Sequence, residues 1–135
     1  MNTTYFLNLL AGAAFHANDS EIPDEYYIGL STTTPNTSGT GYTEPSTSAG
    51  YARVALSSYL GEPDSGVVTN QYSVDFPSST ASWGTITYFV VFDDSTRGSG
   101  NLLMYGALST SRTVESGTIV SIQAGSLTLT VQDAS

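Results

Sequence analysis

Apolar positions near the N-terminus recur with the period of an α-helix. In residues 1–17 they follow i, i+3, i+4 spacing, and Asn2 or Thr3 can supply the N-cap. The apolar positions of this stripe are Phe6, Leu9, Leu10, Ala13, Ala14 and Ala17. The pattern predicts one amphipathic helix, whose apolar stripe packs either on the sheet of the same chain or on a partner subunit.

Short apolar runs bounded by Gly, Pro, Asn, Asp or Ser follow from residue 25 onward, and this spacing is typical of β-strands. The expected strands are residues 26–31, 51–57, 66–70, 72–77, 83–92, 102–108, 118–122 and 126–131. We therefore predict a mainly β fold that forms a single domain over residues 1–135. It combines a short N-terminal α-helix over residues 1–17 with an antiparallel β-sandwich of about eight strands over residues 25–131.

A polar segment rich in Thr, Ser, Gly and Pro joins the first two predicted strands across residues 32–50. Loops of this length are unusual in a small domain, and they tend to be functional or anchored against a neighbour. We therefore expect this loop or the N-terminal helix to lie in a contact with another subunit or with the capsid. The candidate residues of this interaction surface are Phe6, Leu9, Leu10, Ala13, Tyr42 and Glu44.

The charge balance narrows the classes of partner. Three Lys or Arg residues stand against twelve Asp or Glu residues, which gives a formal net charge of −9. The three cations are Arg53, Arg97 and Arg112, so direct nucleic-acid binding through phosphate neutralisation is disfavoured. An anionic membrane surface would also repel the chain, and the apolar run near the N-terminus is too short to span a bilayer. Because cysteine is absent, no disulfide, thiolate or cysteine-zinc site is expected.

Two adjacent carboxylates, Asp93 and Asp94, interrupt the longest apolar stretch of the chain. A paired-carboxylate catalyst needs two acids that face each other, whereas neighbouring residues on a strand or loop point apart. The stretch "DDSTRGSGN" also departs from the spacing of a calcium-binding loop. Asp, Ser, Gly and Asn favour turns, so we interpret residues 93–101 as a hairpin turn.

The remaining candidate side chains also favour structural roles. His16 is the single histidine, and at a helix end it can cap free carbonyl groups. Arg53 lies on a predicted strand, and we interpret it as the partner of a carboxylate rather than as a ligand clamp. Neither G-x-S-x-G nor S-x-x-K occurs, so no serine is marked as a nucleophile. We expect no catalytic, cofactor-binding or metal-ligating residue.

The segments "GYARVAL", "WGTITYFVVFD" followed by "GNLLMYGAL", and "AGSLTLTV" occur in this order along the chain. In order and spacing they resemble a family of small structural proteins of tailed bacteriophages, often labelled tail fibre or capsid-associated. The resemblance covers most of the chain, although the serine-rich turn and the lack of lysine depart from the usual pattern. It implies a virion component that is not an enzyme.

Our leading hypothesis is a capsid decoration or cement protein, or a head-fibre subunit, that is assembled in the host cytoplasm. The alternative is a tail fibre or baseplate component that contacts the host surface. A third hypothesis, a carbohydrate-binding module or hydrolase, rests on the nine tyrosines, which fit a core or an interface better. The expected partners are further copies of the chain, in a trimer that suits capsid lattice points, and other virion proteins such as the major capsid protein.

The turn interpretation predicts that replacing Asp93 and Asp94 together with Asn changes the free energy of unfolding by at most about 1 kcal/mol, the scale of ordinary turn effects. Urea unfolding of the double variant measures this change. Loss of particle assembly, or of a measurable enzymatic activity, in that variant would contradict the interpretation.

Overall fold

The computed structural model describes residues 1–15, 23 and 25–130, so His16, Ala17 and Asp24 lie outside the described residues. The N-terminal helix, α1, spans Thr4–Phe15. Thr3 is its N-cap, because its hydroxyl accepts a hydrogen bond of 3.2 Å from the amide of Phe6. The described part of α1 therefore confirms the predicted helix and one of its two predicted caps.

Eight strands follow the helix within the described residues, as the apolar runs predict. They are β1 (Tyr27–Ser31), β2 (Val54–Ala55), β3 (Val67–Thr69), β4 (Val74–Asp75), β5 (Gly84–Phe92), β6 (Leu102–Val114), β7 (Ser121–Ile122) and β8 (Thr128–Thr130). A single turn of 3₁₀-helix, η1 (Thr47–Ala49), precedes β2. The strands form one four-stranded sheet in the order β2-β1-β5-β6 and two ladders, β3-β8 and β4-β7. Every pairing is antiparallel.

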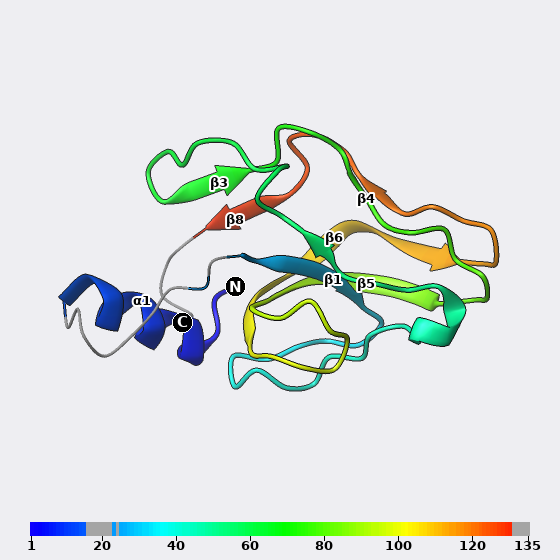
Figure 1. The fold of residues 1–135 in the computed structure, drawn as a ribbon, viewed down its shortest axis with the longest axis horizontal. Coiled ribbons are helices and arrows are strands. Elements are labelled where there is room, and N and C mark those ends of the chain that lie inside the picture. The colour runs from blue at the N-terminus through cyan, green and yellow to red at the C-terminus, as the bar shows by residue number, and fades with distance from the viewer. Residues whose placement is uncertain (16–22, 24, 131–135) are drawn as a thin grey trace.

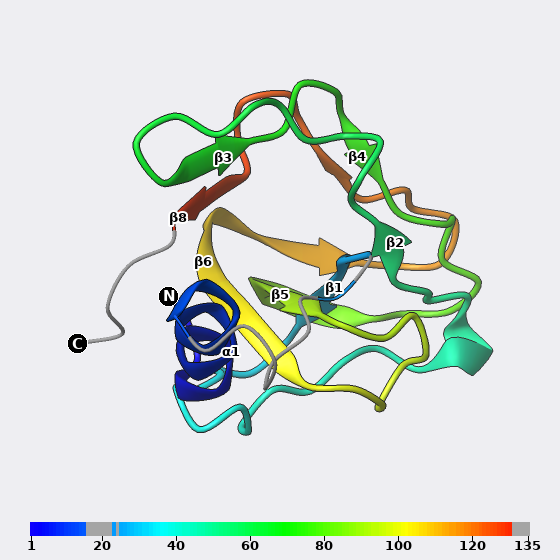
Figure 2. The ribbon, with the colours of Figure 1, turned by 60° about the vertical axis from the view of Figure 1, so that its left-hand side comes forward.

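The two ladders lie on the same side of the four-stranded sheet, and they form a second layer above it (Figures 1 and 2). The core fills the space between these layers. The sheet contributes Ile28, Leu30, Ile86 and Leu103, and the second layer contributes Val74, Val120, Ile122, Leu127 and Leu129. This arrangement confirms the mainly β, antiparallel fold and gives the chain a core of the sandwich type.

The N-terminal segment is part of the sheet layer. The amide of Thr3 donates to the carbonyl oxygen of Leu103 at 2.9 Å, and the amide of Tyr105 donates to that of Met1 at 2.9 Å. Residues 1–3 thus lie along the outer edge of β6, and α1 packs against the same strand. Phe6 is 5% exposed and belongs to the core, so the apolar stripe of α1 packs on the sheet of its own chain.

Trp83, the residue immediately before β5, is part of the core. It is 4% exposed, and its indole N–H donates to the carbonyl oxygen of Ala49 at 2.9 Å. The Tyr51 ring meets the indole edge to face, with 5.5 Å between the ring centroids. The side chain therefore joins β5 to η1 by burial and by a hydrogen bond.

We expect Trp83→Ala to lower the free energy of unfolding by about 3–5 kcal/mol, because the truncation leaves a cavity and an unpaired carbonyl group. Urea unfolding followed by circular dichroism measures the loss. Trp83→Phe is the matched control, since it keeps a ring in the core and should cost less. A loss below about 1 kcal/mol for the alanine variant would contradict this account of the core.

Candidate functional site

A buried ion pair joins the long polar loop to the segment that immediately precedes β2. Glu44 in the loop is 4% exposed, and its two carboxylate oxygens accept from Arg53 Nη2 at 2.7 Å and Arg53 Nε at 2.9 Å. Tyr51 donates its hydroxyl proton to the second of these oxygens at 2.5 Å. We call these three side chains, Glu44, Tyr51 and Arg53, the Glu44 network. The two-pronged contact is the geometry that an arginine and a carboxylate favour, and it confirms that Arg53 is the partner of a carboxylate.

The backbone of β1 makes room for the Glu44 network. Gly29 faces it, and a Cβ atom at this position would overlap the Tyr51 hydroxyl and lie 2.9 Å from a carboxylate oxygen of Glu44. The Tyr51 hydroxyl also accepts a hydrogen bond of 3.1 Å from the amide of Leu30. A glycine in the middle of a buried strand therefore has a packing reason, which is the close approach of the network.

The Glu44 network also holds the connection between β5 and β6. Arg53 Nη1 donates to the carbonyl oxygens of Asp94, at 2.7 Å, and Ser99, at 2.8 Å. The amide of Gly98 donates back to Glu44 at 3.2 Å. The guanidinium carbon of Arg53 lies 3.5 Å from the centroid of the Phe92 ring, which adds a cation–π contact. One arginine thus fixes a loop that is remote in sequence.

A second arginine, in the connection of residues 93–101, adds hydrogen bonds to the loop of residues 32–50. We call this contact between the two loops the loop junction. Arg97 donates from Nε to the carbonyl oxygen of Pro45 and from Nη2 to that of Glu44, both at 2.8 Å. Arg97 of the connection of residues 93–101 therefore bonds to the loop of residues 32–50, and Arg53, which follows that loop, bonds to the connection. Two of the three arginines of the chain serve this junction.

The electrostatics of the Glu44 network favour a permanent ion pair. Burial alone would raise the pKa of the Glu44 carboxyl, but hydrogen bonds from Arg53 and Tyr51, the charge of Arg53 and the amide of Gly98 together hold that pKa below its ordinary value. Burial and the charge of Glu44 raise the pKa of Tyr51. The carboxylate accepts four hydrogen bonds within the protein, so it has no free lone pair for a substrate. The arrangement is structural rather than catalytic.

The two adjacent carboxylates occupy a turn, as predicted. Asp93 accepts from the backbone amide of Asn101 at 2.7 Å and from its side-chain amide at 3.0 Å. Asp94 accepts from the amide of Thr96 at 2.8 Å. Gly100 has a φ of +81°, and a Cβ atom there would lie 2.6 Å from a carboxylate oxygen of Asp93, so the turn requires glycine. Both carboxylates bind local amides, which is the ordinary chemistry of a turn.

The residues expected to form an interaction surface have different environments. Phe6 and Glu44 are buried within the chain: Phe6 packs in the core and Glu44 is paired with Arg53. Leu9, Leu10 and Ala13 are half-buried on α1, and Leu9 and Leu10 pack against the core. Tyr42 is half-buried, with its ring edge to face against Phe92 at 5.1 Å. A contact between these six residues and a partner stays a prediction.

The outward face of α1 is the surface that the sequence pattern did not identify. Three of the five large apolar side chains that are exposed in the described part of the chain belong to the first fifteen residues: Met1, Tyr5 and Phe15. Phe15 is 90% exposed and Tyr5 is 45% exposed. The available signal was that α1 contains few polar residues on any side, whereas a helix facing water carries a polar face.

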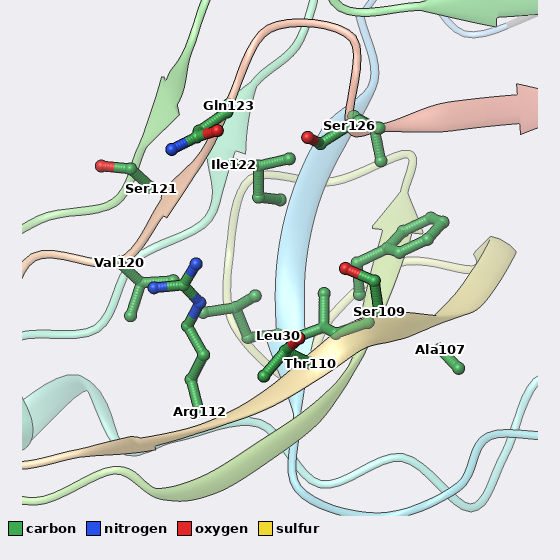
Figure 3. Close-up of a pocket in the computed structure, with 13 residues that line it drawn as sticks. Leu30, Ala107, Ser109, Thr110, Arg112, Val120, Ser121, Ile122, Gln123 and Ser126 are labelled. Carbon is green, nitrogen blue, oxygen red and sulfur yellow. The ribbon is translucent and has the colours of Figure 1, made fainter.

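A groove of about 210 Å³ lies between β6 and the segment that carries β7 and leads to β8 (Figure 3). Buried side chains such as Leu30, Ile122 and Leu127 form its floor, and Ser, Thr and Gln side chains line its rim together with Arg112. Within the described residues no group of three His, Cys, Asp or Glu side chains could hold a metal ion. The same residues include no helix long and apolar enough to cross a membrane.

We expect Glu44→Gln to lower the free energy of unfolding by about 3–5 kcal/mol, because it leaves the charge of Arg53 buried and uncompensated. Urea unfolding at neutral pH measures the loss, and Glu115→Gln on the exposed surface is the matched control. A loss below about 1 kcal/mol would mean that the ion pair does not hold the two loops together.

The lowered pKa of Glu44 also makes the free energy of unfolding depend on pH. A carboxyl whose pKa is lower in the folded state stabilises the fold above its unfolded value, near 4.5, and loses this effect as the pH falls through the lowered pKa. The free energy of unfolding of the unmodified protein should therefore fall on acidification below about pH 5 more steeply than that of Glu44→Gln. Parallel pH profiles for the two proteins would contradict this assignment.

Comparison with known proteins places these features in a family. The model of a family described as podophage GP4 fiber I protein gp80 matches residues 2–130. No curated protein matches the chain. The match covers nearly the whole sequence, including the N-terminal segment on β6, the Glu44 network and the groove, and it confirms the resemblance to phage structural proteins. The chain therefore belongs to this family of phage fibre proteins, which are structural components of the virion.

Proposed function

We propose that the protein is a non-enzymatic subunit of a fibre on the phage particle, assembled as a homo-oligomer in the host cytoplasm. The family description supports a fibre subunit over a cement protein of the capsid shell. A head fibre that contacts the major capsid protein is the first placement. A tail fibre or baseplate component at the host surface is the second, and the groove beside β6 favours it, because a fibre that meets a cell surface needs a binding site.

The observation that carries the proposal is the apolar outward face of α1. Exposed large apolar side chains cluster on the first fifteen residues, and apolar clusters of this kind commonly mark protein interfaces. Burial of such surface against a neighbouring virion protein contributes about 25 cal/mol per Å². The net charge of −9 makes copies of the chain repel each other, so apolar contact or a basic partner surface must supply the attraction.

A structural role also agrees with the interior chemistry. The buried acid of the Glu44 network is saturated with hydrogen bonds, and the adjacent aspartates bind local amides in a turn. These groups stabilise loops, and none of them is poised to transfer a proton to a ligand. Such an interior suits a rigid module in a larger assembly.

The test replaces exposed side chains rather than deleting α1, because residues 1–3 are bonded to β6 and Phe6 is in the core. We expect the double variant Tyr5→Ser, Phe15→Ser to fold normally and to join particles at least about tenfold less than the unmodified protein, as loss of central interface contacts does. Tyr72→Ser is the matched control, since Tyr72 is 61% exposed and far from α1 along the chain. Quantitative immunoblotting of purified particles measures incorporation.

Normal incorporation of the double variant would contradict attachment through α1. Immunogold labelling of intact particles decides between head and tail, and label on neither structure would overturn the proposal as a whole. Light scattering on the purified protein tests assembly: we expect a trimer, and a monomer at all concentrations would contradict the homo-oligomer.

A further inference from the structure

The groove beside β6 combines three features that the structural role does not explain. It lies between the sheet layer and the second layer, and its volume of about 210 Å³ equals the space of about seven water molecules. That volume accommodates one ring-sized ligand and is too small for a large cofactor. The features are an arginine, a bulge and an aromatic ring.

The first feature is Arg112, the one arginine that the loop junction does not use. The side chains of Arg53 and Arg97 bind carboxylate and carbonyl oxygens inside the chain, whereas the guanidinium group of Arg112 makes no hydrogen bond or ion pair with any residue that the structure describes. Its side chain extends from β6 toward β7 at the mouth of the groove (Figure 3). A guanidinium in this position has its N–H donors available for a carboxylate.

The second feature is an irregularity in β6. Arg112 pairs with Ile86, and Ala107 pairs with Tyr88, so the four residues 108–111 face Thr87 alone. These residues have no register partner in β5, and β6 is the outermost strand of the sheet within the described residues. Bulges recur beside binding sites, where they redirect side chains. Here Ser109 and Thr110, two residues of the bulge, line the groove.

The third feature is the ring of Phe89, which lies against Gly106 on the neighbouring strand. A Cβ atom on Gly106 would lie 2.7 Å from the Cζ atom of this ring, so the glycine allows the ring to cover the backbone. Phe89 also lines the groove, where it adds an apolar, aromatic surface to the buried floor.

We propose that this groove binds one acidic sugar unit, of the hexuronate class, through a carboxylate contact to Arg112. The sugar hydroxyls would bond with the serine and threonine groups of the rim, and an apolar face of the ring would pack on Phe89. An acidic peptide fits less well, because it needs several cations and the groove has one. The biological setting, a polysaccharide at the host surface, rests on the proposed function as a fibre, whereas the binding belongs to the chain itself.

The test is an NMR titration of the ¹⁵N-labelled full chain with galacturonic acid, with galactose as the neutral match. We expect saturable shifts at the amides of residues 107–112 and 121–127, and at least about tenfold weaker binding of galactose, because a hydrogen-bonded charge pair is lost. Arg112→Gln should weaken galacturonate binding by a similar factor. Ser116→Asp is the matched control, since it makes the same change in net charge on an exposed turn outside the groove.

Equal affinity for galactose and galacturonate, or unchanged affinity in Arg112→Gln, would overturn the role of the arginine. Shifts confined to other regions, or no shifts up to the solubility of the sugar, would overturn the site. Tighter binding of triglutamate in the groove would overturn the sugar assignment in favour of an acidic peptide. None of these results bears on particle location, so the fibre proposal is judged separately by immunogold labelling.

Discussion

The ion pair between Glu44 and Arg53 is the constraint on which the loop-rich half of the molecule depends. Residues 32–53 and 93–101 have little regular pairing of their own, so side-chain bonds must replace the ladder bonds that order a sheet. Burying two charges is costly, and the cost is offset only when good geometry and further donors satisfy them. The hydroxyl of Tyr51, the amide of Gly98 and two loop carbonyl groups meet that condition.

The same network explains which part of the site could be predicted from sequence. Arg53 stands within an apolar strand pattern, and a buried cation needs a carboxylate, so its structural role follows from local sequence. The identity of its partner does not follow, because Glu44 lies in a polar loop whose residues ordinarily face water. Only the packing of that loop against β1 and the 93–101 connection buries the carboxylate. The sequence alone therefore does not identify Glu44 as the partner of Arg53.

In the fold, the features that depend on the side-chain pattern could be predicted from the sequence, whereas those that depend on backbone pairing could not. Buried strands such as β5 consist of apolar runs bounded by turn-forming residues, so their predicted bounds lie close to the observed ones. The predicted strand ends at Leu108, whereas β6 continues to Val114, because an edge strand with both faces exposed has no such pattern in its sequence. The pairing of residues 1–3 with β6 involves backbone atoms, so it leaves no signature in the sequence. The bulge in β6 could not be predicted from the sequence either, because it is also a feature of backbone pairing.

The excess of acidic residues over arginines affects how the protein can bind an anion. The twelve acidic residues create a field that opposes any anionic ligand, and two of the three arginines are committed to loop carbonyls and Glu44. Arg112 therefore acts only through short contacts, since long-range attraction of an anion is absent. A single site of this kind binds weakly. Repetition of the site in the proposed homo-oligomer would compensate, because linked sites raise avidity without any new contact within the subunit.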